Sequence, residues 1–129
     1  MVGKMLTYPV GDFLVKIKNA VLAGQSNVSV GATREKLAIA KALKEAGFVE
    51  SQAVAAGKLE LKLKFDHKEP VLLDIRLISR PGCRVYLKAA DLRKKKGPSI
   101  YLLNSSKGVV TSKEALKLKV GGEVIAELW

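Results

Sequence analysis

Apolar and charged residues alternate most regularly between residues 58 and 65. Leucine or phenylalanine stands at every second position, and lysine or glutamate stands between them (Leu59, Leu61, Leu63 and Phe65; Lys58, Glu60, Lys62 and Lys64). A period of two is typical of a β-strand with one buried face. Because Ala56-Gly57 precedes this segment, residues 48–54 and 58–65 are predicted to form a hairpin.

A helical period is visible in residues 7–23. Apolar side chains recur there at spacings of three and four (Val10, Phe13, Leu14, Ile17 and Val21), while lysines fall on other faces. Pro9 suits the first turn of a helix, with Thr7 as the capping residue. The pattern predicts an amphipathic helix over this segment.

A second helix is predicted over residues 33–46. Thr33 is a good N-cap, Gly47 is a typical C-terminal stop, and three apolar side chains face inward (Leu37, Ala40 and Leu43). Residues 28–30 before it are a short strand candidate.

The chain beyond residue 70 is predicted to consist mainly of short strands. The candidates are residues 71–78, 84–88, 100–103 and 123–129. Pro81-Gly82 and Gly121-Gly122 indicate tight turns. Residues 89–93 can make one helical turn, and Thr111-Ser112-Lys113-Glu114 has the spacing of a capping box for a short helix to about residue 118.

These elements give an α+β fold with two lobes. Residues 1–75 form an N-terminal α/β lobe of helix, strand, helix and hairpin. Residues 76–129 form a C-terminal, mostly β lobe with one short helix, packed against the first. With 129 residues, the chain is too short for two ordinary independent domains, so the lobes are expected to share a core.

Composition excludes several classes of protein. A hydrophobic content of 48% excludes a mainly disordered chain, and the apolar runs are far shorter than a membrane span. No signal peptide is visible, which predicts a cytoplasmic protein. One cysteine, Cys83, and one histidine, His67, cannot build an internal disulfide or a zinc site, so no metal or other cofactor is expected.

The charge indicates a polyanionic partner. Lys and Arg number 23 against 12 Asp and Glu, a net charge of +11. The excess is uneven: residues 1–75 carry +3 and residues 76–129 carry +8. Nucleic acid is the commonest partner of so basic a chain, and the second half is expected to bind it.

The segment from Asn104 to Thr111 carries the most informative side chains. Ser105 and Ser106 can donate to and accept from phosphate, ribose and base edges. Lys107 adds a positive charge, and Gly108 allows a partner's backbone to come close. Because no carboxylate, histidine or cysteine stands nearby in sequence, these hydroxyls lack a base to activate them. The segment is interpreted as a binding surface.

Four blocks occur in order along the chain: residues 9–20, 78–86, 104–115 and 120–129. Together they resemble the bacterial small-subunit ribosomal protein eight family over nearly the whole length. The resemblance implies a structural constituent of the small ribosomal subunit, not an enzyme. It implies a primary binder of the central domain of small-subunit (16S) ribosomal RNA that aids subunit assembly. Neighbouring ribosomal proteins are implied partners, and in many bacteria the family also represses translation of its own operon's messenger.

The resemblance also implies which residues meet the RNA. The turn residues Ser105, Ser106, Lys107 and Gly108 carry over directly, with Asn104 in place of the usual serine and Ser105 in place of the usual threonine. Three residues of the Gly-Gly-Glu block (Gly121, Gly122 and Glu123) and two of the Arg-Val-Tyr block (Arg84 and Tyr86) are implied to lie near it. From charge alone, Lys94, Lys95 and Lys96 are expected to form an exposed loop that contacts phosphate without sequence preference.

Several alternatives stay open. The Ser105–Gly108 segment could be an ordinary polar turn. Glu123 could accept from a base amino group, orient Lys107 or simply begin a strand, and Tyr86 could stack on RNA or pack against the protein. Two rival functions are an enzyme, which would enclose the serines in a cleft, and a basic adaptor for acidic membranes or proteins, which would place its cations on an amphipathic helix.

Overall fold

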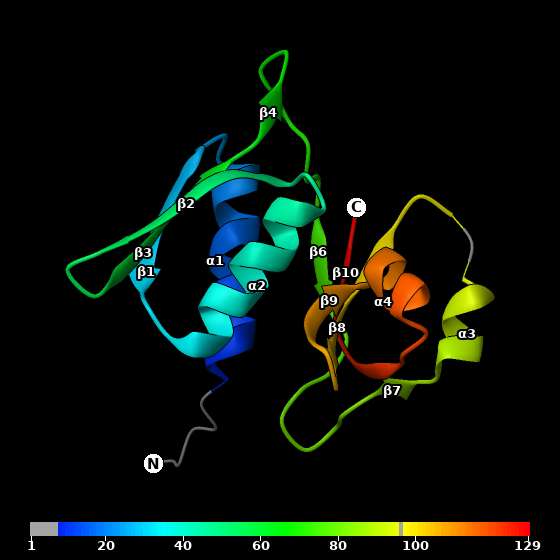
Figure 1. The fold of residues 1–129 in the computed structure, drawn as a ribbon. Helices are drawn as coiled ribbons and strands as arrows, with labels where there is room; N and C mark the ends of the chain where they lie inside the picture. The colour runs from blue at the N-terminus through cyan, green and yellow to red at the C-terminus, as the bar shows by residue number, and fades with distance from the viewer. Residues whose placement is uncertain (1–7, 96) are drawn as a thin grey trace.

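The computed structural model describes residues 8–95 and 97–129. Its first part has a three-stranded antiparallel sheet in the order β1-β3-β2. In chain order the elements are α1 (Pro9–Leu22), β1 (Asn27–Gly31), α2 (Arg34–Glu45), β2 (Val49–Ala55) and β3 (Lys58–Leu63). A small hairpin of β4 (Phe65–Asp66) and β5 (Glu69–Pro70) projects from the end of this part (Figure 1).

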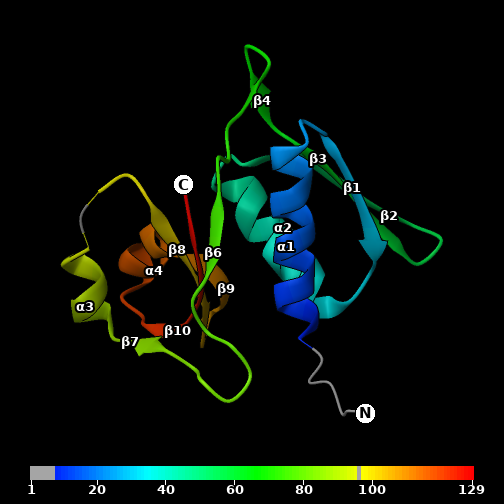
Figure 2. The same ribbon diagram turned by 180° about the vertical axis from the view of Figure 1, so that it is seen from behind.

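The second part is built on a five-stranded sheet with β10 at its centre. Its elements are β6 (Ile75–Leu77), β7 (Tyr86–Leu87), α3 (Ala89–Arg93), β8 (Ile100–Ser105), β9 (Gly108–Thr111), α4 (Ser112–Leu118) and β10 (Gly122–Leu128). The strand order is β6-β10-β8-β9, and β7 also pairs with β10. Helices α1 and α2 lie between the two sheets, as Figures 1 and 2 show from opposite sides.

Two hydrophobic clusters hold these layers together. The larger joins buried side chains of α1, α2 and the first sheet to Leu102, Ile125, Ala126 and Leu128 of the second. The smaller lies beneath α3 and α4 (Leu92, Leu103, Val110, Ala115 and Val124). The five-stranded sheet is therefore covered on both faces, by α1 and α2 on one and by α3 and α4 on the other.

A bulge in β10 decides which of its side chains meets which cluster. Val124 stands opposite Leu103 and Ala126 opposite Leu102, so Ile125 is an extra residue without a β8 partner. Directly opposed residues of paired strands point to the same face, and neighbours along a strand point to opposite faces. Before the bulge, Val124 faces the smaller cluster; after it, Ala126 faces the larger. The bulge exchanges the two faces of the strand.

Most of the predicted elements are confirmed. The α+β class, the hairpin of β2 and β3 and the helix α3 agree with the pattern. Thr33 caps α2 by accepting a hydrogen bond from the Lys36 amide, and Thr111 does the same for α4 from the Glu114 amide. The predicted cap Thr7 lies outside the described residues. Tyr8 occupies the N-cap position of α1 and makes no capping hydrogen bond with its side chain.

Three predictions are wrong in extent or kind. The strand predicted at residues 71–78 is reduced to β6, because only Ile75–Leu77 pairs with β10. The strand at 84–88 is reduced to Tyr86–Leu87 for the same reason. Gly121-Gly122 is not a tight turn: the chain reverses at Lys119, which has a left-handed backbone with φ 59°, and Gly122 already belongs to β10.

Among the described residues, no helix is long and apolar enough to cross a membrane. In the same part of the chain, no three His, Cys, Asp or Glu side chains come together as a metal site would require.

Candidate nucleic-acid interface

Strand β10 brings together residues that are far apart in sequence. Glu123 stands opposite Tyr86 on β7 and opposite Asn104 on β8. Gly122, the residue before it, stands opposite Leu87 and Ser105. Because directly opposed side chains share a face, Tyr86, Glu123 and Asn104 form one row across three strands. Three of the sequence blocks thus meet at one end of the sheet.

The two glycines allow this close meeting. A Cβ added to Gly122 would collide with the backbone carbonyl of Asn104, and one added to Gly121 would collide with the carbonyl of Leu87. Neither glycine has a left-handed backbone. They are explained by the short distance between strands rather than by a turn, and they set the position of Glu123 relative to its neighbours.

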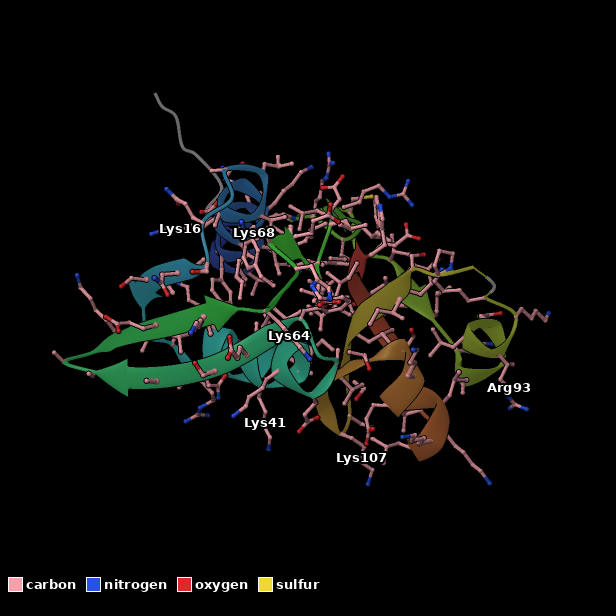
Figure 3. All side chains as sticks on the ribbon, turned by 90° about the horizontal axis from the view of Figure 1, so that it is seen from above. Lys16, Lys41, Lys64, Lys68, Arg93 and Lys107 are labelled. Atoms are coloured by element: carbon pink, nitrogen blue, oxygen red, sulfur yellow. The ribbon has the colours of Figure 1, made fainter. Side chains whose placement is uncertain are left out.

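The hairpin between β8 and β9 exposes its two turn residues. Ser105 shapes the turn: its hydroxyl donates to the Gly108 carbonyl at 2.8 Å and accepts from the Lys107 amide at 3.1 Å. Gly108 has φ 98°, a conformation that favours glycine. Ser106 and Lys107 are exposed, and Figure 3 shows Lys107 pointing away from the protein. Ser105 therefore forms the turn that presents Ser106 and Lys107.

Glu123 pairs with Arg84 in this structure. The Nη1 atom of Arg84 donates to Oε2 of Glu123 at 3.0 Å, and the carboxylate side chain is 15% exposed. This hydrogen bond raises the pKa of Arg84. Of the roles left open for Glu123, orienting Lys107 is not the one seen, because the carboxylate pairs with Arg84 instead. A carboxylate neutralised by arginine no longer repels phosphate as a free one would.

Tyr86, which stands opposite Glu123, is exposed to solvent. The residue is 68% exposed, among the most exposed of the large hydrophobic residues in the described chain. Exposure of an aromatic ring next to an arginine suits stacking on a base or ribose better than it suits packing. Tyr86 and Arg84 are therefore both available at the end of the sheet where the Ser106-Lys107 turn lies.

The two described lysines of the predicted lysine loop have different surroundings. Lys94 is exposed at the end of α3. Lys95, expected to be exposed, is instead drawn against the sheet. Its side chain is 14% exposed, and its Nζ donates to Ser99 at 2.8 Å and lies 3.6 Å from the Glu127 carboxylate. It also lies 4.7 Å from the Tyr101 ring centroid. Lys96 lies outside the described residues.

Lys95 lies near the other end of the sheet from the row of Tyr86, Glu123 and Asn104, and on the opposite face. Tyr101 stands opposite Glu127, near the far ends of β8 and β10. Tyr101 packs with the smaller cluster, on the face covered by α3 and α4. Asn104 shares its face with Leu102, two residues before it, which belongs to the larger cluster. The bulge at Ile125 is what places Glu123 and Glu127 on opposite faces.

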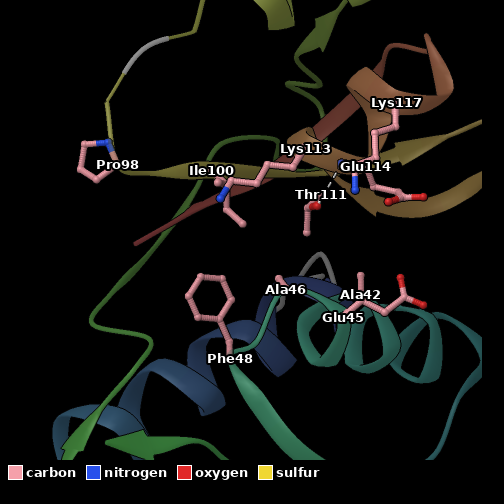
Figure 4. Close-up of a pocket in the computed structure, with 10 residues that line it drawn as sticks. All are labelled: Ala42, Glu45, Ala46, Phe48, Pro98, Ile100, Thr111, Lys113, Glu114 and Lys117. Carbon is pink, nitrogen blue, oxygen red and sulfur yellow. Dashed lines mark hydrogen bonds between the residues drawn. The ribbon is translucent and has the colours of Figure 1, made fainter.

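One hollow of the protein lies away from these residues. It has a volume of about 420 Å³ and lies between α2 and the segment from Pro98 to α4. Figure 4 shows Glu45 and Phe48 on one side and Lys113, Glu114 and Lys117 on the other. None of the described candidate RNA-binding residues lines it. Tyr86, Ser106 and Lys107 are exposed instead.

Tyr8 is a contact of this site that the sequence pattern did not reveal. Its ring lies against Arg84, with 5.5 Å from the ring centroid to the guanidinium carbon. The sequence pattern pointed to Thr7 as the helix cap and gave Tyr8 no role. A usable signal was the glycine one helical turn later, Gly11, whose missing side chain leaves room for the ring.

Comparisons with known proteins give the family. Residues 8–129 match the family model described as ribosomal protein S8. The small ribosomal subunit protein uS8 of Nitratidesulfovibrio vulgaris is 38% identical over 126 residues, which cover 97% of this chain and 100% of the relative. The uS8 of Desulfovibrio desulfuricans is 40% identical with the same coverage. That of Geobacter metallireducens is 38% identical over 130 residues, covering 96% and 98%. As the ordered blocks predicted, this chain belongs to the ribosomal protein S8 family.

Proposed function

We propose that this chain is a structural constituent of the small ribosomal subunit that binds the central domain of the subunit's RNA. The relatives' names support the first part, because each is a small ribosomal subunit protein. One observation carries the second part. Tyr86, Glu123 and Asn104 form a row in which Glu123 pairs with Arg84, and the exposed Ser106-Lys107 turn follows Asn104 along the chain.

The chemistry of this surface suits an irregular RNA helix. Small hydroxyl side chains on an open turn can reach 2′-hydroxyl groups and base edges in a shallow minor groove. Lys107 supplies a charge for phosphate, and Arg84 keeps N–H donors beyond the one that Glu123 accepts. Tyr86 offers a ring for stacking. Contacts that read shape and contacts that read charge are thus placed side by side.

An enzymatic function is not proposed. The exposed turn holds Ser106 away from the hollow beside α2, so water would surround any reacting group there. The membrane-adaptor reading also loses support, because α1 and α2 bury their apolar faces between the two sheets.

The division into lobes of residues 1–75 and 76–129 is part of the same proposal. The second lobe would hold the RNA, with neighbouring ribosomal proteins as further partners in the cytoplasmic ribosome. The net charges of +3 and +8 support this assignment. The same surface would bind the messenger of the protein's own operon, so excess small-subunit RNA should compete with that messenger for the protein.

Footprinting of the purified protein on small-subunit ribosomal RNA tests the proposal. Protection should concentrate in the central domain. Ser106→Ala should weaken binding to this RNA more than binding to a regular duplex, because the hydroxyl reads an irregular site. Ser51→Ala, an exposed position on β2, is the matched control and should change neither. Equal losses on both RNAs with Ser106→Ala would remove the specific role of this hydroxyl.

A further inference from the structure

Tyr8 connects the start of α1 to the loop that carries Arg84. Its hydroxyl donates to the Ser79 carbonyl at 3.0 Å, across 71 positions of sequence. Ser79 is fully buried, and its own hydroxyl accepts from the Val85 amide at 2.9 Å. Tyr8 is therefore fixed to the base of the turn between β6 and β7, which lies beside the start of α1 in Figure 2.

The ring of Tyr8 restrains the Arg84 side chain from one side. The guanidinium carbon lies 5.5 Å from the ring centroid, within the range of a cation–π contact. Glu123 restrains the same group along its edge, through the 3.0 Å hydrogen bond from Nη1. Two partners in different directions fix the plane of a flexible side chain. The Arg84 side chain nevertheless stays 43% exposed, so it can still meet a ligand.

Gly11 makes the ring position possible. A Cβ at this buried helix position would collide with Cδ2 of Tyr8. The ring thus packs directly on the backbone of α1. Burial raises the pKa of Tyr8, and this effect outweighs the lowering by Arg84. The hydroxyl therefore remains protonated and continues to donate to Ser79.

We propose that Tyr8 is a positioning residue for RNA binding, which holds the guanidinium of Arg84 ready at the end of the five-stranded sheet. The proposal rests on the proposed function, because Arg84 is assigned there to the RNA surface. Its physical content is preorganisation: an arginine already held in place loses less conformational freedom when its ligand arrives. A residue of the first lobe would thereby tune a surface of the second.

A double-mutant cycle tests this role with purified small-subunit ribosomal RNA and the full chain. Tyr8→Ala should weaken binding about two- to fivefold, the size of one exposed cation–π contact. In an Arg84→Ala background, the same change should have no further effect, because Tyr8 acts through Arg84. Tyr8→Phe keeps the ring and should lose less. Additive losses from Tyr8→Ala and Arg84→Ala would overturn the proposal.

A stability control separates positioning from simple weakening of the fold. Val28→Ala removes buried volume from β1 without touching Arg84. It should lower the free energy of unfolding and leave RNA affinity unchanged under conditions where the protein stays folded. If Val28→Ala weakened binding as much as Tyr8→Ala does, the effect of Tyr8 would be structural only.

Gly11→Ala gives a second route to the same conclusion. The new methyl group should displace the Tyr8 ring and reproduce the loss of affinity, while in a Tyr8→Ala background it should change affinity little. An unchanged affinity for Gly11→Ala in the otherwise natural chain would count against the proposal. Failure of the unaltered protein to bind the RNA would instead reject the proposed function itself, which distinguishes the two.

Discussion

Lys107 and Lys95 both lie in short connections next to β8, yet their ammonium groups have different surroundings. Lys107 lies in the turn that follows β8 and is exposed. Lys95 comes before β8, and Ser99, Glu127 and the Tyr101 ring surround its ammonium group. Both lysines were predicted to meet RNA, Lys107 in the serine turn and Lys95 in an exposed loop that contacts phosphate. The structure leaves one cation free for solvent and uses the other inside the protein.

This difference shows that the net charge of the chain overstates the number of cations that can contact RNA, because some lysines are already paired within the protein. The positive charge of a lysine that contacts a carboxylate and an aromatic ring is partly neutralised. Such a lysine therefore attracts a polyanion less strongly than an unpaired one. Lys18 also has a carboxylate partner, because its ammonium group lies 3.3 Å from the Asp74 carboxylate. The Ser106-Lys107 turn has one lysine where the other loop has three in sequence, and Lys107 forms no ion pair with any residue that the structure describes.

The largest expected effect concerns the backbone that supports the Lys107 end of the sheet. Gly122→Ala should lower the free energy of unfolding by about 1–3 kcal/mol, because the new methyl group overpacks the contact with Asn104. RNA affinity should fall with it. Chemical denaturation measures the loss. Gly31→Ala on β1, where a Cβ meets nothing within 4 Å, is the control. Similar losses for both would show that the close approach is not required.

The comparison itself is tested by Lys107→Ala. Removal of one available phosphate contact should weaken RNA binding about three- to tenfold and reduce the salt slope of the affinity by about one unit. Titrations at several salt concentrations give this slope. Lys95→Ala should leave the slope nearly unchanged. If both variants reduced it equally, the two lysines would be equivalent and the contrast drawn between them would be wrong.

Lys95→Ala should act on stability instead. Loss of the pair with Glu127 and of the contact with Tyr101 should lower the free energy of unfolding by about 0.5–1 kcal/mol. Thermal or denaturant unfolding measures this change. Lys94→Ala, an exposed neighbour, is the matched control and should have almost no effect. A stable Lys95→Ala variant would mean that the inward contacts of Lys95 contribute little.

The smallest expected effect is a pH dependence of stability that comes from Glu127, the partner of Lys95. A hydrogen bond from Ser99, followed by the charges of Arg76 and Lys95, holds the pKa of Glu127 below its ordinary 4.5 despite burial. A lowered pKa in the folded state means that this stabilisation is present above pH 4.5 and is lost as the pH falls below it.

Glu127→Gln should therefore reduce stability at pH 7 and flatten its decline in acid. The free energy of unfolding at pH 7 and near pH 3.5 gives the comparison, with Glu60→Gln on the exposed side of β3 as the control. Parallel pH curves for the natural protein and Glu127→Gln would remove the assigned role of Glu127.

Local signals in the sequence were sufficient for elements whose stability is local. Thr33, with its side-chain cap, predicted α2 correctly. The alternation over residues 58–65 predicted the hairpin of β2 and β3, although β3 itself ends at Leu63. Long-range pairing was not visible in the same way. Leu73 and Asp74 belong to an apolar run, but their amides bond to the Trp129 carbonyl rather than to a strand ladder, so the predicted strand is shorter.

The candidate site was predicted in composition but not in arrangement. The resemblance named Arg84, Glu123 and the serine turn, and the register of β10 brings them to one end of the sheet. The partner of Glu123 and the contact of Tyr8 depend on which strands neighbour β10. The role of Gly121-Gly122 was also not predictable from sequence. A glycine pair that forms a turn and a glycine pair that lies against a neighbouring backbone have the same sequence.

Because Ile125 is an extra residue, the alternation of side chains between the two faces of the sheet is reversed from one half of β10 to the other. Glu123 and Glu127 are four positions apart, and in an uninterrupted strand they would project from the same side. Deleting Ile125 would restore that alternation and turn one of the two acids toward the wrong layer, so that either Arg84 or Lys95 would lose its counter-ion. The length of this strand, counted to a single residue, therefore matters as much as its composition.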